Sequence, residues 1–153
     1  MADQRPFVSS VPFDEARIRA ASVYCSDGRY GLQMDEFLQE KLKLPRYDRL
    51  AVPGGPACLS GALSVFWEGR SAERQLEFLQ RVHGLERVVL IAHEGCAFYR
   101  DWLKIPPERI LAQQTADLAA AKERIRHLGA ALAVEAHFAR RVDAAVHFSP
   151  IPL

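Results

Sequence analysis

The residues best suited to chemistry lie in two short motifs, Cys25-Ser26-Asp27-Gly28-Arg29 and His93-Glu94-Gly95-Cys96. Zinc prefers thiolate and imidazole ligands arranged as a tetrahedron. Cys25, His93 and Cys96 supply three such ligands. The fourth position is filled by water in a catalytic site and by a side chain in a closed one. The two motifs therefore predict a site for one zinc ion (Zn²⁺).

Asp27 and Arg29 stand beside the first of these cysteines. Asp27 follows Cys25 by two residues and could therefore reach the metal itself. A bidentate pair with Arg29 would hold the carboxylate away from the metal, and breaking that pair would release it. We expect Asp27 to control the acid–base state of the site and Arg29 to control Asp27.

The elements that must position these motifs alternate between strands and helices. Apolar, β-favouring runs predict strands at 19–24, 49–52, 87–92, 131–138 and 144–148, the last two forming a hairpin around 140–143. Helical spacing predicts helices at 32–44, 59–67, 72–83, 97–103 and 107–128, with Gly129 ending the last one. Residues 1–18 are predicted to form an irregular arm.

This alternation predicts a single α/β domain over residues 1–153. We expect three layers (α/β/α) around a mainly parallel sheet of four to five strands, with an antiparallel strand at its C-terminal edge. In such folds, ligands bind beyond the carboxyl ends of the strands. Cys25, Gly54-Gly55 and His93 each follow a predicted strand, so three remote segments are expected to meet at one edge of the sheet.

The order and spacing of these motifs resemble the beta class of carbonic anhydrases. That family carries Cys-x-Asp-x-Arg after its first strand and His-x-x-Cys after its third, with a Gly-Gly turn after the strand between them. The residues that match this pattern are Cys25, Asp27, Arg29, Gly54, Gly55, His93 and Cys96.

The resemblance implies reversible hydration of carbon dioxide to bicarbonate by a zinc-bound hydroxide. It implies that Asp27 accepts a hydrogen bond from the hydroxide and that Arg29 keeps Asp27 ionised. Gly54 and Gly55 would let the backbone approach the substrate pocket and the metal without a Cβ in the way. The resemblance also implies a homodimer or a higher homo-oligomer.

The chain departs from the family pattern around the substrate pocket. Its arm is shorter than the N-terminal helices with which family members clasp the partner subunit. Val52-Pro53 stands where the family has Asn-Ala, and Ala97 stands where glycine is usual. Three alternatives therefore stay open: a non-catalytic zinc domain in which Asp27 closes the site, a hydrolase of carbonyl sulfide or carbon disulfide, and a metal-free thiol enzyme.

Charge and composition exclude several classes of function. The chain has 20 basic and 19 acidic residues and a net charge of +1, which argues against a nucleic-acid or membrane-surface partner. The longest purely apolar run, 88–92, is too short to span a bilayer. Residues 1–6 lack the apolar core of a secretory signal. With three cysteines, metal or thiol chemistry in the cytoplasm is favoured over a disulfide framework.

The remaining chemically active residues have a simpler interpretation. Cys58 is expected to pack in the core, and Glu94 to face solvent or cap a helix. The histidines outside the motifs are interpreted as non-ligands: His83, His127, His137 and His147. The aromatic residues near the motifs are interpreted as core or interface: Phe66, Trp67, Phe98, Tyr99 and Trp102.

Overall fold

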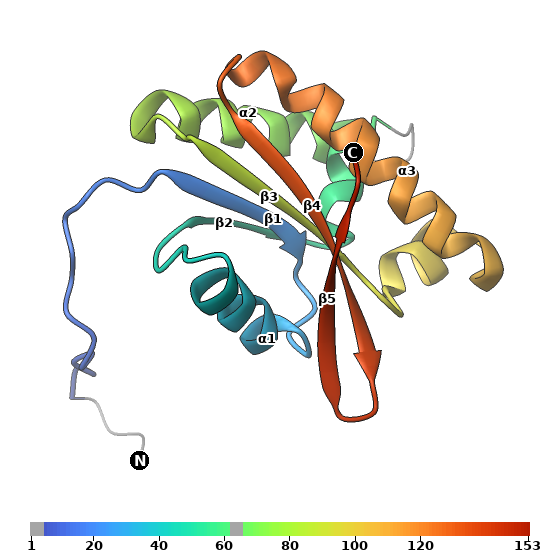
Figure 1. Ribbon diagram of the computed structural model, residues 1–153, viewed down its shortest axis with the longest axis horizontal. Coiled ribbons are helices and arrows are strands. Elements are labelled where there is room, and N and C mark those ends of the chain that lie inside the picture. The colour runs from blue at the N-terminus through green and yellow to red at the C-terminus, as the bar shows by residue number, and fades with distance from the viewer. Residues whose placement is uncertain (1–4, 62–65) are drawn as a thin grey trace.

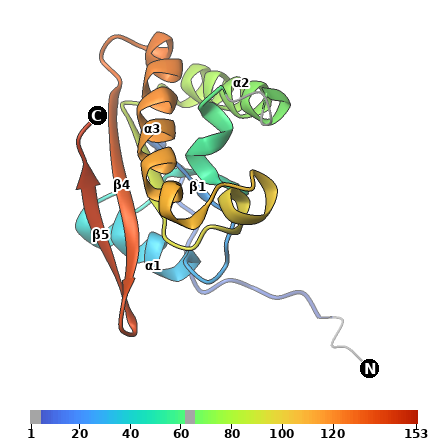
Figure 2. The ribbon, with the colours of Figure 1, turned by 90° about the vertical axis from the view of Figure 1, so that its right-hand side faces the viewer.

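The computed structural model describes residues 5–61 and 66–153, with residues 66–69 described in their backbone only. The predicted α/β class is confirmed, with helices on both faces of a central sheet (Figures 1 and 2). The sheet has five strands in the order β2-β1-β3-β4-β5. Their bounds are β1 (Ala20–Cys25), β2 (Asp48–Val52), β3 (Arg87–His93), β4 (Ala133–Val142) and β5 (Ala145–Ile151).

Strand pairing brings the predicted motifs to one edge of the sheet. β1 pairs in parallel with both β2 and β3, and β3 pairs in parallel with β4. In this register Tyr24 lies opposite Ile91, so Cys25 at the end of β1 and His93 at the end of β3 are near neighbours. The antiparallel strand at the C-terminal edge is confirmed, since β5 pairs antiparallel with β4.

The helices differ in detail from the predictions. α1 (Gly31–Glu36) continues into the π-helical turn η1 (Phe37–Lys41), and the π-helical turn η4 (Phe98–Trp102) replaces the helix predicted at 97–103. Of the helix predicted at 59–67, residue 59 ends the 3₁₀ helix η2 (Gly55–Leu59), residues 60–61 belong to no helix, residues 62–65 lie outside the described residues, and residues 66–67 begin the next helix. The long helices are α2 (Phe66–His83) and α3 (Pro107–Ile125).

A short 3₁₀ turn, η5 (Arg126–Leu128), follows α3. The helical segment therefore ends at Gly129, as predicted. Gly129 has extended backbone (φ 171°) and does not form a left-handed cap. Among the described helices, none is long and apolar enough to cross a membrane.

Two cores cover the two faces of the sheet. On one face, Leu76 of α2 and Leu118 of α3 pack against Leu90 of β3. On the other face, Met34 of α1 packs in a cluster with Ile91 of β3. Neighbouring residues of a strand point to opposite faces, so the run 88–92 of β3 is apolar because both of its faces are buried.

Candidate metal centre

The structure brings Cys25, His93 and Cys96 together at the carboxyl ends of β1 and β3. The ligand atoms of the three side chains all lie within 4.8 Å of one another, and the two sulfurs are 3.9 Å apart. All three residues are buried. Cys25 is the last residue of β1, His93 the last of β3, and Cys96 comes three residues later. The strand ends thus place two thiols and one imidazole in a single buried cluster.

The imidazole of His93 is oriented as a metal ligand would be. Its Nδ1 donates a hydrogen bond to the carbonyl oxygen of Glu94 at 2.8 Å, which leaves Nε2 with the lone pair of the neutral ring. Nε2 is buried and has no hydrogen-bond partner among the described residues. A buried acceptor without a donor is costly, and a metal ion at the cluster would remove that cost. Two thiols and an imidazole are the ligand types that zinc prefers, so the residues present fit the ion.

The two cysteines titrate as a pair. The hydrogen bond from Cys96 lowers the pKa of the Cys25 thiol, burial opposes this effect, and the neighbouring His93 side chain and the backbone amide of Gly54 lower the pKa further. The same sulfur–sulfur contact raises the pKa of Cys96. The contact therefore favours the thiolate on Cys25 over the thiolate on Cys96. Thiolates are the form that binds metal, so this pair is prepared for one.

Gly54 and Gly55 shape the turn behind the cluster. Both have left-handed backbone, with φ of +78° and +54°. A Cβ on Gly55 would lie 2.7 Å from the backbone of Tyr24 and Cys25, and one on Gly54 would lie 2.4 Å from the Phe98 ring. Gly55 is thus needed for η2 to approach the end of β1. The role of Gly54 and Gly55 in a substrate pocket stays a prediction.

Asp27 and Arg29 form the ion pair that the sequence predicted. Arg29 Nη2 lies 2.6 Å from Asp27 Oδ2, and Arg29 Nε lies 3.0 Å from Oδ1. The backbone amide of Arg29 also donates to Oδ1 at 3.1 Å. These hydrogen bonds lower the pKa of Asp27 to about 2. The carboxylate is therefore ionised at neutral pH and is directed toward Arg29.

A hollow of about 430 Å³ opens beside Cys25 and Asp27. Its apolar wall is formed by Pro53, Phe98 and Trp102. The rings of Phe98 and Trp102 are stacked, with centroids 6.4 Å apart and planes 10° apart. The two aromatics interpreted as core or interface residues thus line a space next to the cluster, and Trp102 is 66% exposed.

Two further residues support His93 and were not predicted. Gln114 of α3 is buried and donates its side-chain amide to the backbone oxygen of His93 at 2.8 Å. The Tyr30 ring lies 4.4 Å from the His93 ring, and its hydroxyl donates to the Glu94 carbonyl at 3.0 Å. Outer contacts of this kind orient metal ligands. Tyr30 follows the first motif directly, whereas no sequence pattern marks Gln114.

The other residues singled out lie apart from this cluster. Cys58 is buried in the core on the α2 and α3 face, as predicted. The exposed carboxylate of Glu94 accepts the backbone amide of Arg141 at 3.0 Å. A second close group, Glu73, Glu77 and His127, lies between α2 and η5. Arg124 pairs with Glu73, and His127 pairs with Glu77. The group is therefore interpreted as a surface ion-pair cluster.

Comparison with known proteins defines the class. Residues 16–148 match the family described as "Putative carbonic anhydrase", and the chain belongs to that family. Its fold is similar to that of beta-carbonic anhydrase isoform I from Trichomonas vaginalis, with a TM-score of 0.57 and 15% identity, covering 92% of this chain and 87% of that chain. At this identity the likeness concerns the fold alone.

The chain also matches a curated protein that is described without an activity. The chain is 24% identical over 78 residues to the uncharacterized protein RC0076 of Rickettsia conorii. That match covers 51% of this chain and 41% of the relative, so the chain spans about two fifths of that protein's length.

Proposed function

We propose that this protein is a zinc-dependent carbonic anhydrase-like lyase that interconverts carbon dioxide and bicarbonate. The observation that carries the proposal is the buried Nε2 of His93, which has no hydrogen-bond partner in the part of the chain that the structure describes and lies beside two cysteine sulfurs 3.9 Å apart. Membership of the carbonic anhydrase family supports the same reaction class. Cys25, His93 and Cys96 would hold the ion, which leaves one tetrahedral position for water.

Zinc bound by these residues supplies a Lewis acid that lowers the pKa of a water molecule to about 7. Asp27 is ionised in the neutral range because its pKa is lowered to about 2, so it would accept a hydrogen bond from a water molecule beside the cluster and orient that water. Arg29 fixes the direction of the Asp27 carboxylate through two guanidinium nitrogens. Pro53, Phe98 and Trp102 offer an apolar wall, which suits an uncharged molecule such as carbon dioxide.

The Asp27–Arg29 pair favours catalysis over a site closed by Asp27. A closing carboxylate would have to leave three hydrogen bonds with Arg29 at 3.1 Å or less. Charge-assisted, bidentate pairs of this kind are among the stronger hydrogen bonds in proteins. We therefore propose that Asp27 stays paired with Arg29 at neutral pH and does not act as a ligand.

Stopped-flow measurement of carbon dioxide hydration on zinc-loaded protein tests the proposal, with zinc content measured on the same sample. We expect one zinc per chain and a hydration rate above buffer that Cys96→Ser abolishes and Cys58→Ser retains. One bound zinc with a rate equal to buffer would contradict the lyase. Turnover of carbonyl sulfide or carbon disulfide by that sample would favour the hydrolase alternative. The cytoplasmic location and the homo-oligomer stay predictions.

A further inference from the structure

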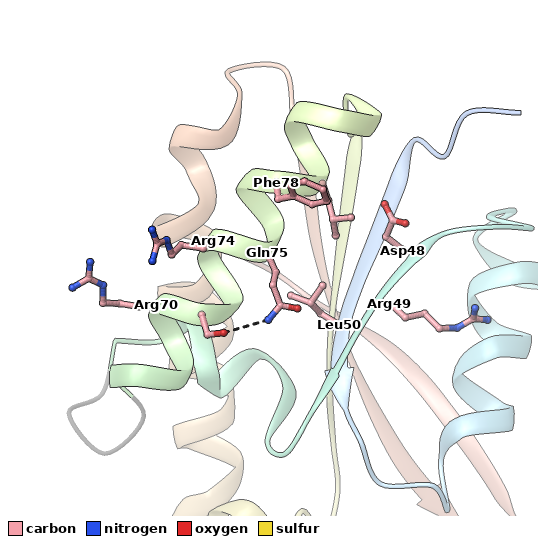
Figure 3. Close-up of a pocket in the computed structure, with 9 residues that line it drawn as sticks. Asp48, Arg49, Leu50, Arg70, Arg74, Gln75 and Phe78 are labelled. Atoms are coloured by element: carbon pink, nitrogen blue, oxygen red, sulfur yellow. Dashed lines mark hydrogen bonds between the residues drawn. The ribbon is translucent and has the colours of Figure 1, made fainter. Parts of the chain in front are cut away.

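The two long helices place their polar side chains differently, although both cover the same face of the sheet. On α2, which borders a hollow of about 710 Å³ beside β2, Arg70 and Arg74 extend away from β2 (Figure 3). Gln75 of the same helix donates a hydrogen bond to Ser71, one turn earlier, at 3.3 Å (Figure 3). These groups face solvent or bond within their own helix. On α3, by contrast, two polar side chains are buried and bond to groups outside the helix.

The two buried polar side chains of α3 are Gln114, which is 2% exposed, and Asp117, which is 5% exposed. Gln114 donates to the backbone oxygen of His93 at 2.8 Å. Asp117 accepts a hydrogen bond from the Tyr99 hydroxyl through Oδ2 at 2.6 Å. Residues three apart on a helix lie on the same face. One face of α3 therefore contacts both His93 and the turn that follows the second motif.

The Asp117 carboxyl group uses both of its oxygens. Tyr99 donates to Oδ2, and the side-chain amide of Gln113 donates to Oδ1 at 3.0 Å. Burying a carboxyl group costs free energy that an apolar side chain at the same place would not cost. A buried polar group whose hydrogen bonds are all made specifies one arrangement of the elements that it joins. The Asp117–Tyr99 pair thus fixes η4 against α3.

η4 in turn contacts the second cysteine of the metal cluster. Tyr99 follows Cys96 by three residues, and its ring packs in one buried cluster with Cys25 and Cys96. The Cys96 sulfur accepts hydrogen bonds from the backbone amides of Phe98 and Tyr99. π-helical turns often occur at functional sites. Because two amides of this turn hold the sulfur, the position of the turn determines the position of the sulfur.

We propose that Asp117 is a positioning residue of the metal centre. It holds the Tyr99 hydroxyl, the turn that contains Tyr99 holds the Cys96 sulfur, and this sulfur is thereby kept in place to bind the ion. Gln114 acts on the backbone of His93 from the same face of α3, so one helix aligns two of the three ligands. Such outer contacts orient metal ligands and strengthen metal binding. The inference rests on the proposed zinc site but not on the hydration of carbon dioxide.

Zinc affinity, measured by competition with a chelating dye, tests the positioning role. We expect Tyr99→Phe and Asp117→Leu each to weaken zinc binding about 10- to 100-fold, the range typical of a lost outer contact. Tyr47→Phe is the matched control. Tyr47 is also buried and donates its hydroxyl to a carboxyl group, that of Asp35, but it lies in the core on the other face of the sheet. This control should keep the zinc affinity of the wild type.

Substitution with cobalt(II) gives a measurement that a purely structural role would not change. The absorption of Co²⁺ bound by thiolates and imidazole depends on the geometry of its ligands, and its sulfur-to-metal charge-transfer bands report the thiolates directly. We expect fully loaded Tyr99→Phe to show shifted or weakened charge-transfer bands, because the Cys96 sulfur is no longer held in one position. Fully loaded Tyr47→Phe should have the spectrum of the wild type.

The double variant Tyr99→Phe/Asp117→Leu separates positioning from stability. Leucine removes the buried carboxyl group that Tyr99→Phe leaves without its donor, so the metal-free double variant should regain much of the stability that Tyr99→Phe loses. Its zinc affinity and cobalt spectrum should stay those of the single variants, since all three proteins lack the same hydrogen bond. Recovery of zinc affinity together with stability would overturn the inference, as would a wild-type zinc affinity and cobalt spectrum in Tyr99→Phe.

These measurements also distinguish failure of this inference from failure of the lyase. A wild-type protein that binds zinc and hydrates no carbon dioxide, with variants that respond as expected, would contradict the lyase and support the positioning role. Hydration by the wild type together with an unchanged cobalt spectrum and zinc affinity in Tyr99→Phe would overturn the positioning role alone. A wild-type protein that binds no zinc would overturn both.

Discussion

Arg29 holds Asp27 by two nitrogens of its guanidinium and by its own backbone amide, so these three contacts fix the direction of the carboxylate. The pair lies within one turn, because the two residues are separated only by Gly28. Arg29 is largely exposed while Asp27 is mostly covered. Asp27, the covered residue, is thus the one proposed to contact the reacting water. The exposed Arg29 positions Asp27.

Asp27→Asn should retain zinc and lower the hydration rate at least about 100-fold, because the neutral amide accepts hydrogen bonds more weakly and is no longer fixed by Arg29. Glu86→Gln is a suitable control, since it removes a carboxylate paired with arginine at the amino-terminal end of the strands. Rates and zinc content should be measured together. Full activity in Asp27→Asn would refute the role given to this carboxylate.

Cys96→Ser should lose zinc and lower the melting temperature by about 10 °C or more relative to the zinc-loaded wild type, since metal binding stabilises the folded state. Cys58→Ser is the matched control, because both cysteines are buried and only Cys96 belongs to the cluster. A chelator should lower the melting temperature of the wild type and of Cys58→Ser but leave Cys96→Ser unchanged. Equal responses in all three proteins would show that the cluster binds no metal.

Gly55→Ala should reduce the free energy of unfolding by about 3 kcal/mol, because alanine is strained at a φ of +54° and its Cβ would press on the backbone of β1. Gly28→Ala serves as the control, since a Cβ there meets nothing within 4 Å, and its cost should stay within about 0.5 kcal/mol. Urea unfolding measures both. Similar costs at the two positions would contradict the close approach between η2 and β1.

Two histidines should titrate in opposite directions when followed by NMR. The hydrogen bond with Glu77 raises the pKa of His127 above its ordinary value of 6.5, and burial lowers the pKa of His137 below it. Glu77→Gln should return the pKa of His127 toward 6.5 and leave that of His137 unchanged.

The sign of the linked stability follows from the raised pKa of His127. The protonated ring stabilises the fold below pH 6.5, and that contribution is lost as pH rises through the higher pKa of the folded state. Glu77→Gln should therefore destabilise the protein below pH 6.5 and have no effect through His127 well above its folded pKa. A stability difference between the two proteins that is constant with pH would contradict the linkage.

The strands and the edge of the sheet that carries the cluster could be predicted from sequence, because local patterns of residues indicate both. The all-apolar run in β3 and the motifs at strand ends determine the sheet edge where Cys25 and His93 meet. Gln114 could not be predicted, since its contact with His93 depends on how α3 packs against β3, 21 residues away along the chain. The π-helical turn at Phe98–Trp102 also has no sequence signal of its own.

The 3₁₀ helix over Gly55–Leu59, which precedes and overlaps the predicted helix at 59–67 only at residue 59, was not predicted. Every residue of this 3₁₀ helix is buried. Leu59 and Cys58 pack in the core on the α2 face, and Gly55 presses against β1. Burial of this short segment therefore determines its backbone, as tertiary packing often does.

The separation of the cluster along the chain affects folding as well as chemistry. Cys25 and Cys96 are 71 residues apart, although their sulfurs are in contact in the fold. An ion held by both would tie the two central strands together and restrict the unfolded chain, much as a disulfide does. Closing a loop of that size costs an unfolded chain about 4 kcal/mol of conformational freedom. The metal would then act as a reversible clasp, and its supply could decide how long each molecule stays folded.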